Sequence, residues 1–246
     1  WRGLQRAMSG DLDSTSCPGS RAALPVVSAG GRAGHLPTPG PVRVLSLVPA
    51  GAADIRDTPV DTFGDVDARL FRSNLLRAGE TLTRATAAVA SRFGVVPRIL
   101  PMSDDPVATR IAVVADGKEN DLHFQEYWVR RGGRDEVKAV RYENAERSRP
   151  APGVLEALSN ADAILLCPSN PVASLGPILA VPGIREAVAA RRSDVVGVSG
   201  IVAGAPLAGM ADRLMPAVGA EVTAAGAAEC YRGLLGAWGV DDADRA

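Results

Sequence analysis

The chain is poor in the residues that build covalent or metal-based scaffolds. Its 246 residues include only two histidines and three cysteines, Cys17, Cys167 and Cys230, which lie far apart and form no CxxC pair. A disulfide framework, a zinc ribbon and a histidine-rich metal site are therefore not expected. Cys167 closes an apolar strand and Cys230 falls in a helical pattern, so both are predicted to be small core side chains.

An excess of charge of one sign is also absent. The 27 Lys and Arg residues nearly balance the 28 Asp and Glu residues, for a formal net charge of −1. This balance argues against binding to nucleic acid or to a membrane surface through bulk charge. No apolar run reaches the roughly 18–20 residues of a membrane span, and no basic and apolar signal peptide opens the sequence. We predict a cytoplasmic protein with no nucleic-acid and no membrane partner.

Residues 1–41 lack a sustained period of either 2 or 3.6 residues. Residues 1–60 hold 15 Gly or Pro and contain no Lys, Tyr or Phe, a composition typical of loops or disorder. The apolar run at 42–48 allows one short strand. We therefore predict an irregular N-terminal segment over 1–62 and an α/β domain over 63–246.

The domain 63–246 alternates helical and strand patterns. Hydrophobic residues make up 46% of the chain, which is enough for a sizeable core. Short apolar runs between helices are typical of parallel strands covered on both faces. The pattern predicts an α/β fold, a doubly wound, mostly parallel, Rossmann-like sheet with helices on both faces. The predicted strands are 95–100, 110–115, 163–167, 195–198 and 221–223, the predicted helices are 66–77, 81–93, 152–159, 184–191, 211–218 and 227–238, and 122–129 is open to either.

The loop at 101–105 carries the first candidate site. In doubly wound sheets ligands bind at the carboxyl ends of the strands, and this loop, with Ser103, Asp104 and Asp105, follows a predicted strand. Two carboxylates behind a serine can hold a divalent cation or position a hydroxyl for proton transfer. The alternative is that Ser103 and Asp104 cap a helix or a turn.

Two further loops and one histidine complete the candidates. The loop at 167–177 offers Ser169 and Asn170, and its alternative is a purely structural loop held by prolines. The loop at 199–209 has small residues, as expected where backbone approaches a phosphate. The chain contains neither a GxxxxGK[ST] loop nor a strand-linked GxGxxG. His123 is a candidate base, although a histidine beside aromatic residues is more often packed or hydrogen-bonded.

Five motifs occur in order along the chain. They are Pro-Met-Ser-Asp-Asp-Pro-Val at 101–107, His-Phe-Gln-Glu-Tyr-Trp-Val at 123–129, Pro-Ser-Asn-Pro-Val-Ala-Ser-Leu-Gly-Pro-Ile-Leu at 168–179, Val-Pro-Gly-Ile-Arg at 181–185 and Gly-Ala-Pro-Leu-Ala-Gly-Met-Ala-Asp at 204–212. Over residues 64–246 this pattern resembles the 2-phospho-L-lactate transferase family, also called CofD-like, of coenzyme F-420 biosynthesis.

The resemblance implies a transferase. Family members move a phospholactyl or phosphoenolpyruvyl group from a guanylylated donor to the deazaflavin precursor Fo, and GMP leaves. Mg²⁺ assists, and Asp104 and Asp105 are the expected catalytic carboxylates, with Asp104 also the metal ligand. The family further suggests a homodimer. The expected substrate-binding residues in the part of the chain that matches are Ser103, His123, Ser169 and Asn170.

Departures from the family pattern lie at the start of the chain. Family members open with a first strand and a Gly-rich loop, so we expect the first strand to be missing and this copy to be truncated or disrupted. Asp13, in Gly-Asp-Leu-Asp-Ser at 10–14, matches the family residue that contacts the deazaflavin, whereas Thr62 stands where the family has a basic contact. The departures favour two alternatives: a non-catalytic regulator that binds a nucleotide or nucleotide sugar, or a core without a ligand.

Overall fold

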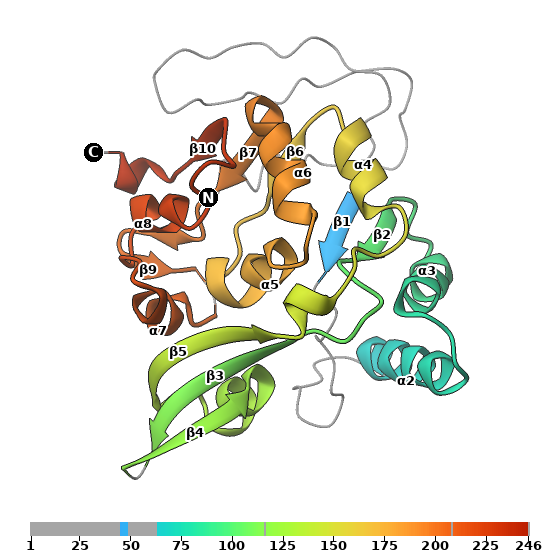
Figure 1. The fold of residues 1–246 in the computed structure, drawn as a ribbon, viewed down its shortest axis with the longest axis horizontal. Coiled ribbons are helices and arrows are strands. Elements are labelled where there is room, and N and C mark those ends of the chain that lie inside the picture. Colours follow the sequence, from blue (N-terminus) through green and yellow to red (C-terminus); the bar gives the residue numbers. More distant parts are fainter. Residues whose placement is uncertain (1–44, 49–62, 116, 208, 246) are drawn as a thin grey trace.

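Parallel strands form the centre of the protein. The computed structural model describes residues 45–48, 63–115, 117–207 and 209–245 (Figure 1). Strand β1 pairs with β2, and β7 lies between β6 and β10, all in parallel. The predicted α/β class is confirmed, and the run at 42–48 supplies β1. The bounds are Leu45–Val48 (β1), Arg98–Pro101 (β2), Ile164–Leu166 (β6), Val195–Val198 (β7) and Ala237–Gly239 (β10).

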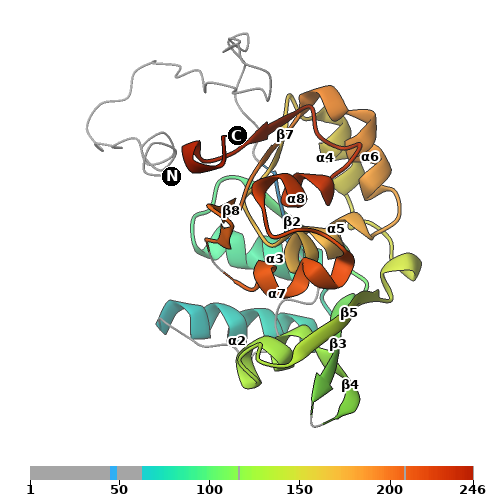
Figure 2. The same ribbon diagram turned by 90° about the vertical axis from the view of Figure 1, so that its left-hand side faces the viewer.

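Helices cover both sides of these strands. In Figure 2, α4 and α6 lie on one side of the strands, and α2 and α3 lie on the other. Among the described residues, no single helix is long and apolar enough to cross a bilayer. The helical segments Pro171–Leu179 and Ile184–Ala190 together reach the required length and apolar composition, but the chain bends sharply between them. The bounds are Phe63–Arg77 (α2), Leu82–Arg92 (α3), Val154–Asn160 (α4), Gly176–Leu179 (α5), Ile184–Ala190 (α6), Ala211–Leu214 (α7) and Ala224–Glu229 (α8).

Amphipathic spacing explains how α4 and α6 attach to the sheets. Val154 and Leu158 of α4 are four residues apart, as are Ile184 and Val188 of α6, so each pair lies on one face of its helix. All four side chains are buried in one cluster. Because strand residues from both parallel sheets belong to that cluster, the two sheets share a single core. These strand residues are Leu100, Ile164, Leu166 and Val195.

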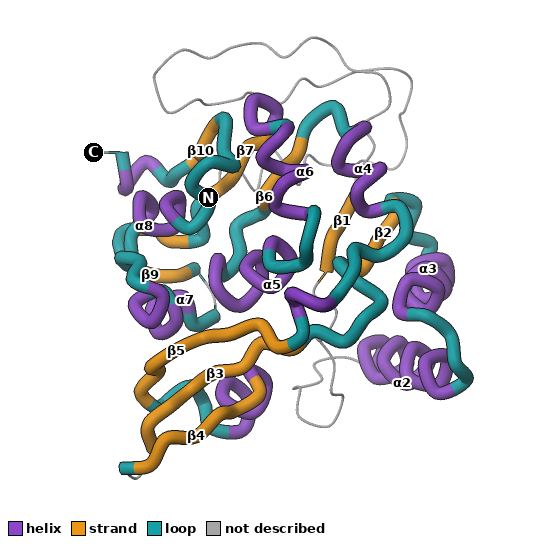
Figure 3. Tube along the Cα trace, in the orientation of Figure 1, coloured by secondary structure: helices purple, strands orange, loops and turns teal. Residues whose placement is uncertain are grey.

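A three-stranded antiparallel sheet extends from the parallel part of the molecule (Figure 3). Strand β3 (Ala108–Ala115) lies between β4 (Lys118–His123) and β5 (Glu136–Glu143). The sequence predicted β3 but not β5. The pairing of β5 with β3 contains a β-bulge, where the register shifts. The alternation of inward and outward side chains along β5 changes phase at this bulge, so the usual two-residue strand pattern is not visible in the sequence. Segment 122–129, for which the sequence allowed either a strand or a helix, contains both: β4 ends at His123, and a helical turn follows.

Two predictions for the C-terminal part are wrong. Residues 221–223 form no strand in the described chain, because the Thr223 side chain instead accepts a hydrogen bond from the first turn of α8 and caps that helix. Residues 227–238 are not one helix, because α8 ends early and Trp238 lies in β10. The Trp238 ring covers Gly197 of β7, where any side chain would overlap the ring. This contact selects the strand over the helix.

Strand β2 also begins later than its apolar pattern predicts. The predicted strand 95–100 starts at Val95, but β2 starts at Arg98. Val95 and Val96 precede Pro97 in an exposed turn after α3, and 94% of Val96 is accessible to solvent. Within the predicted strand only Leu100 is buried, and Ile99 is half-buried.

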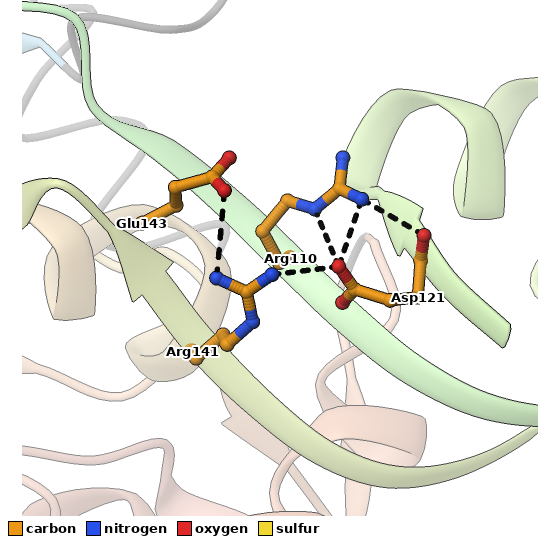
Figure 4. Close-up of polar contacts among 4 residues, drawn as sticks. All are labelled: Arg110, Asp121, Arg141 and Glu143. Carbon is orange, nitrogen blue, oxygen red and sulfur yellow. Dashed lines mark hydrogen bonds and ion pairs between the residues drawn. The ribbon is translucent and has the colours of Figure 1, made fainter. Parts of the chain in front are cut away.

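Charged side chains on the antiparallel sheet form one network (Figure 4). Arg110 of β3 lies opposite Arg141 of β5, an unfavourable pairing of like charges. The Asp121 carboxylate of β4 compensates, because it accepts hydrogen bonds from Arg110 at 2.8 and 3.0 Å and from Arg141 at 2.6 Å. Glu143 adds an ion pair with Arg141 at 3.6 Å. Partial desolvation opposes the effect, but these hydrogen bonds lower the pKa of Asp121 below its ordinary value of 3.8.

The Asp121→Asn variant is expected to lower Tm by about 1–4 °C at pH 7, because an exposed ion network contributes modestly to stability. Because the pKa of Asp121 is lower in the folded state, the network stabilises the fold fully at pH values above the ordinary pKa of Asp. This stabilisation is lost as the pH falls through the folded-state pKa. The difference in Tm between variant and unmodified chain should therefore shrink as the pH falls below the ordinary Asp pKa of 3.8. Thermal melts from pH 2.5 to 7 measure it. Glu119→Gln, at an exposed carboxylate on the same strand, is the control, and a pH-independent difference for Asp121→Asn would contradict the network.

Tyr142 of β5 joins the antiparallel sheet to the segment that follows β6. Its hydroxyl donates a 2.6 Å hydrogen bond to the carbonyl of Val172. Burial raises the pKa of Tyr142 to about 12, so the hydroxyl keeps its proton at neutral pH. The ring packs against Gly176, where a Cβ would overlap the Tyr142 hydroxyl. Glycine at 176 thus allows the two segments to approach.

The Gly176→Ala variant is expected to lower the free energy of unfolding by about 1–3 kcal/mol, because the new methyl group displaces a buried ring from its hydrogen bond. The higher helix propensity of alanine, about 1 kcal/mol, offsets part of this loss. Urea unfolding measures the change. Gly239→Ala is a matched control, since a Cβ there meets no atom closer than 3.6 Å. Equal stabilities of the two variants would show that the Tyr142 contact is not tight.

Candidate functional site

A cleft lies where the loops after β6 and β7 face the segment after β4. It consists of two adjoining cavities with volumes of about 510 Å³ and 310 Å³. The larger runs along β6 and is lined mainly by apolar side chains, whereas the smaller lies between residues 168–170 and Gly200. The smaller cavity thus lies at the carboxyl ends of β6 and β7, as expected for a doubly wound fold, and the larger one extends from there along β6. Five residues line both cavities: Phe124, Trp128, Ser169, Ala173 and Ser174.

Three of the residues predicted from the sequence come together in this cleft. His123 lines the larger cavity, Asn170 lines the smaller one, and Ser169 lines both. They come from two segments far apart in the sequence, the end of β4 and the loop after β6. The antiparallel sheet, held by Tyr142, brings the first segment against the second.

Asn170 shapes the loop after β6. Its side-chain oxygen accepts hydrogen bonds of 2.9 Å from the backbone amides of Val172 and Ala173. These bonds cap the helical turn that begins at Pro171. Gly200 of the neighbouring loop packs against the same segment, since a Cβ there would lie 3.5 Å from the Ser169 backbone. The direction of the chain after β6, and with it the exposure of Ser169 to both cavities, follows from these contacts.

His123 is oriented by the backbone. Its Nδ1 accepts a 3.2 Å hydrogen bond from the amide of Gln125. A backbone amide can only donate, so the neutral imidazole carries its proton on Nε2. His123 therefore presents an N–H donor, which suits a phosphate or carbonyl oxygen and does not suit a general base.

The loop at 101–105 is bound to another part of the chain. The Ser103 hydroxyl donates to the carbonyl of Arg149 at 2.6 Å and accepts from the amide of Asp105 at 3.0 Å. The Asp105 carboxylate accepts from the amide of Arg149 at 2.9 Å. A backbone bridge between Ser103 and Pro150 completes the contact. The end of β2 is thus tied to the segment that precedes α4.

Asp104 contacts the first turn of α3. Its Oδ1 accepts hydrogen bonds from the amide and the hydroxyl of Thr83 at 2.7 and 2.9 Å, where a negative charge is favourable. The contacts of Asp104 are therefore those of a helix cap, the alternative to a catalytic role that the sequence left open. Met102 lines the larger of the two described cavities, but Ser103, Asp104 and Asp105 line neither. Their predicted roles in catalysis, metal binding and substrate binding stay predictions.

Two further predictions fall beyond what the structure describes. Asp13, the predicted deazaflavin contact, and Thr62, at the missing basic contact, lie outside the described residues. Within the described ranges, no group of three or more His, Cys, Asp or Glu side chains is placed to hold a metal ion.

The aromatic residues of the cleft were not among the predicted site residues. Phe124 and Trp128 line both cavities, and their ring centroids are 5.4 Å apart. The aromatic residues next to His123 in the sequence could have indicated this part of the cleft, but the sequence alone favoured a packing role for them. Cys167 was predicted to be a core residue, and this is wrong: it is exposed and lines the larger cavity, because β6 ends at Leu166.

The fold and the cleft define a doubly wound α/β protein with a candidate ligand site beside its parallel strands. The family model described as 2-phospho-L-lactate transferase CofD matches residues 57–243. The chain belongs to the CofD family, and the resemblance carried by the five motifs is confirmed.

Relatives with assigned names support the same family. A phosphoenolpyruvate transferase of Streptomyces griseus is 50% identical over 181 residues, which cover 73% of this chain and 57% of the relative. A phosphoenolpyruvate transferase of Thermobifida fusca is 44% identical over 181 residues, 73% of this chain and 56% of the relative. A 2-phospho-L-lactate transferase of Methanosarcina mazei is 42% identical over 185 residues, 74% of this chain and 59% of the relative. The chain thus spans less than two thirds of the length of these relatives.

Among solved structures, the chain is similar to a protein of the UPF0052 family from Bacillus halodurans. One crystal structure of it aligns with 21% sequence identity and a TM-score of 0.44, covering 68% of this chain and 50% of the other.

The Asp104→Ala variant is expected to lower the free energy of unfolding by about 1–2 kcal/mol, because the amide and hydroxyl of Thr83 lose their acceptor. Chemical denaturation measures this. Asp162→Ala, at an exposed carboxylate after α4, is the control and should change stability by no more than about 0.5 kcal/mol. Unchanged stability of Asp104→Ala would show that the cap contributes nothing.

Proposed function

We propose that the chain transfers a phosphoenolpyruvyl or 2-phospholactyl group from a guanylylated donor to a hydroxyl of the deazaflavin precursor Fo, with release of GMP. This is a step of coenzyme F-420 biosynthesis. The observation that carries the proposal is that His123 and Ser169, from two separate motifs of a CofD-family chain, line one cleft. The names of the relatives supply the two candidate groups.

The cleft offers neutral donors to an anionic ligand. The Ser169 hydroxyl and the Nε2–H of His123 can each donate to a phosphate oxygen. Gly200 and Ala173 are small, so that backbone amides can approach a phosphate closely. In this proposal both side chains bind and orient the donor, and neither acts as the base.

Mg²⁺ belongs to the proposal as the ion that accompanies the diphosphate of the donor, whose charge it neutralises. Asp104 and Asp105 do not fit a dedicated metal cage, because they accept hydrogen bonds from Thr83 and Arg149 and lie outside both cavities. No step is therefore assigned to a metal held by these carboxylates. A cytoplasmic location and a homodimer also belong to the proposal, and sedimentation analysis tests the second.

The proposal is tested by incubating the purified chain with Fo, MgCl₂ and either guanylylated phosphoenolpyruvate or guanylylated 2-phospho-L-lactate. Mass spectrometry is expected to show product from at least one donor, with GMP in equal amount and none of either in excess EDTA. Ser169→Ala should lower kcat/KM by about tenfold or more, since a hydrogen bond to a charged ligand contributes ~1.5–3 kcal/mol. Ser159→Ala, on the exposed surface of α4, is the control.

Asparagine variants separate catalysis from capping. Asp104→Asn and Asp105→Asn keep an oxygen acceptor but remove the charge, so the catalytic role predicted from the sequence requires kcat to fall by about 100-fold or more. An unchanged kcat assigns both carboxylates to the fold alone. If no donor yields product and calorimetry still detects GDP binding, the non-catalytic regulator replaces the transferase.

A further inference from the structure

We infer that Phe124 and Trp128 form a platform on which a planar heteroaromatic ring of a bound substrate stacks. The inference rests on the proposed function, whose two substrates each contain such a ring, the deazaflavin of Fo and the guanine of the donor. The two rings are part of the lining that the two cavities share.

Trp128 is a large aromatic side chain that the described fold leaves partly uncovered. It is 41% exposed, although a ring of this size stabilises a protein most when it is covered. Phe124 packs against it with ring planes inclined by 50°. Exposed aromatic surface alone is not informative, since Phe93 is 55% exposed. Trp128 differs because it lines both cavities, whereas Phe93 lines neither.

The turn that carries Trp128 is anchored by its neighbour Tyr127. Tyr127 is fully buried, its hydroxyl donates to the carbonyl of Gly133 at 3.2 Å, and the amide of Gly133 donates to the carbonyl of Tyr127 at 2.9 Å. Consecutive side chains on a helical turn point in different directions, so Tyr127 can be buried while Trp128 lines the cleft. The turn is also of the wide π-helical type, which is frequent at functional sites. The backbone that carries the Trp128 ring is therefore anchored independently of any ligand.

The smaller cavity offers a few polar groups within a mostly apolar lining. Ser169, Asn170 and Gly200 line it together with the two aromatic rings. A flat ring joined to a phosphate or a polyol chain has the same two-sided chemistry, because its π face can stack on Trp128 while its polar part meets Ser169. A purely ionic ligand would leave the aromatic rings unused, and an aliphatic ligand would leave the polar groups unused.

Calorimetric titrations of the full chain with Fo and, separately, with GDP test the platform. Trp128→Ala is expected to weaken the stacked ligand by about tenfold or more, and Trp128→Phe, which keeps a ring, should retain most of the affinity. Phe93→Ala removes an exposed aromatic ring away from the cleft and serves as the matched control. Thermal melts establish that each variant is folded.

Tryptophan emission provides a readout that does not depend on affinity. A stacked ring is expected to quench the Trp128 indole, so the quenching should persist in Trp238→Phe and disappear in Trp128→Phe. Trp238 is suited to this comparison because it lies in β10, outside both cavities, with its indole N–H bonded to the carbonyl of Ala224 at 3.1 Å.

The outcomes separate the platform from the proposed function. Loss of Fo affinity in Trp128→Ala assigns the platform to the deazaflavin, and loss of GDP affinity assigns it to guanine, so either result supports the inference. Unchanged affinities for both ligands, without quenching of Trp128, overturn the platform but leave the transfer reaction standing. If neither ligand binds the unmodified chain, the platform and the proposed function fail together.

Discussion

The hydrogen bond from the Tyr142 hydroxyl to the Val172 carbonyl connects the two parts of the molecule that form the cleft. One wall comes from the loops at the carboxyl ends of β6 and β7, and the other comes from the segment after β4, which belongs to the antiparallel sheet. Burial keeps the Tyr142 hydroxyl protonated, and the missing side chain of Gly176 leaves space for the ring. His123 and Ser169 line the same cavity, and this contact joins the parts of the molecule to which they belong.

Several polar side chains near the strand ends accept hydrogen bonds from backbone amides. Asn170 satisfies two amides after β6, and Asp104 satisfies the first turn of α3. An unpaired buried amide is costly, so carboxylate and amide side chains are often retained at such places for the fold alone. A pair of acidic residues behind a strand is therefore an ambiguous sign of catalysis. Donors that line the cleft, such as Ser169, are more direct evidence, because they are placed where a ligand can reach them.

Much of the fold was predictable because its signals are local. Thr81 and Gly94 bracket α3, and the apolar run 195–198 is β7 without any change of bounds. Two of the failures concern elements that a distant partner selects, whereas the strand predicted at 221–223 fails for a local reason, the Thr223 cap of α8. Trp238 is in a strand because its ring packs on Gly197, and β5 contains a bulge that only its pairing with β3 explains.

The candidate site was predictable only in its local parts. The sequence by itself determined the α/β class, the family and the loops that follow the strands, because periodicity, capping residues and contiguous motifs are properties of short segments. It did not determine which of those loops meet. Only the tertiary structure decided that His123, Ser169 and Trp128 share a cleft, and that Asp104 contacts Thr83 instead of that cleft. The physical reason is that these outcomes depend on contacts between segments far apart in the chain, which no local pattern records.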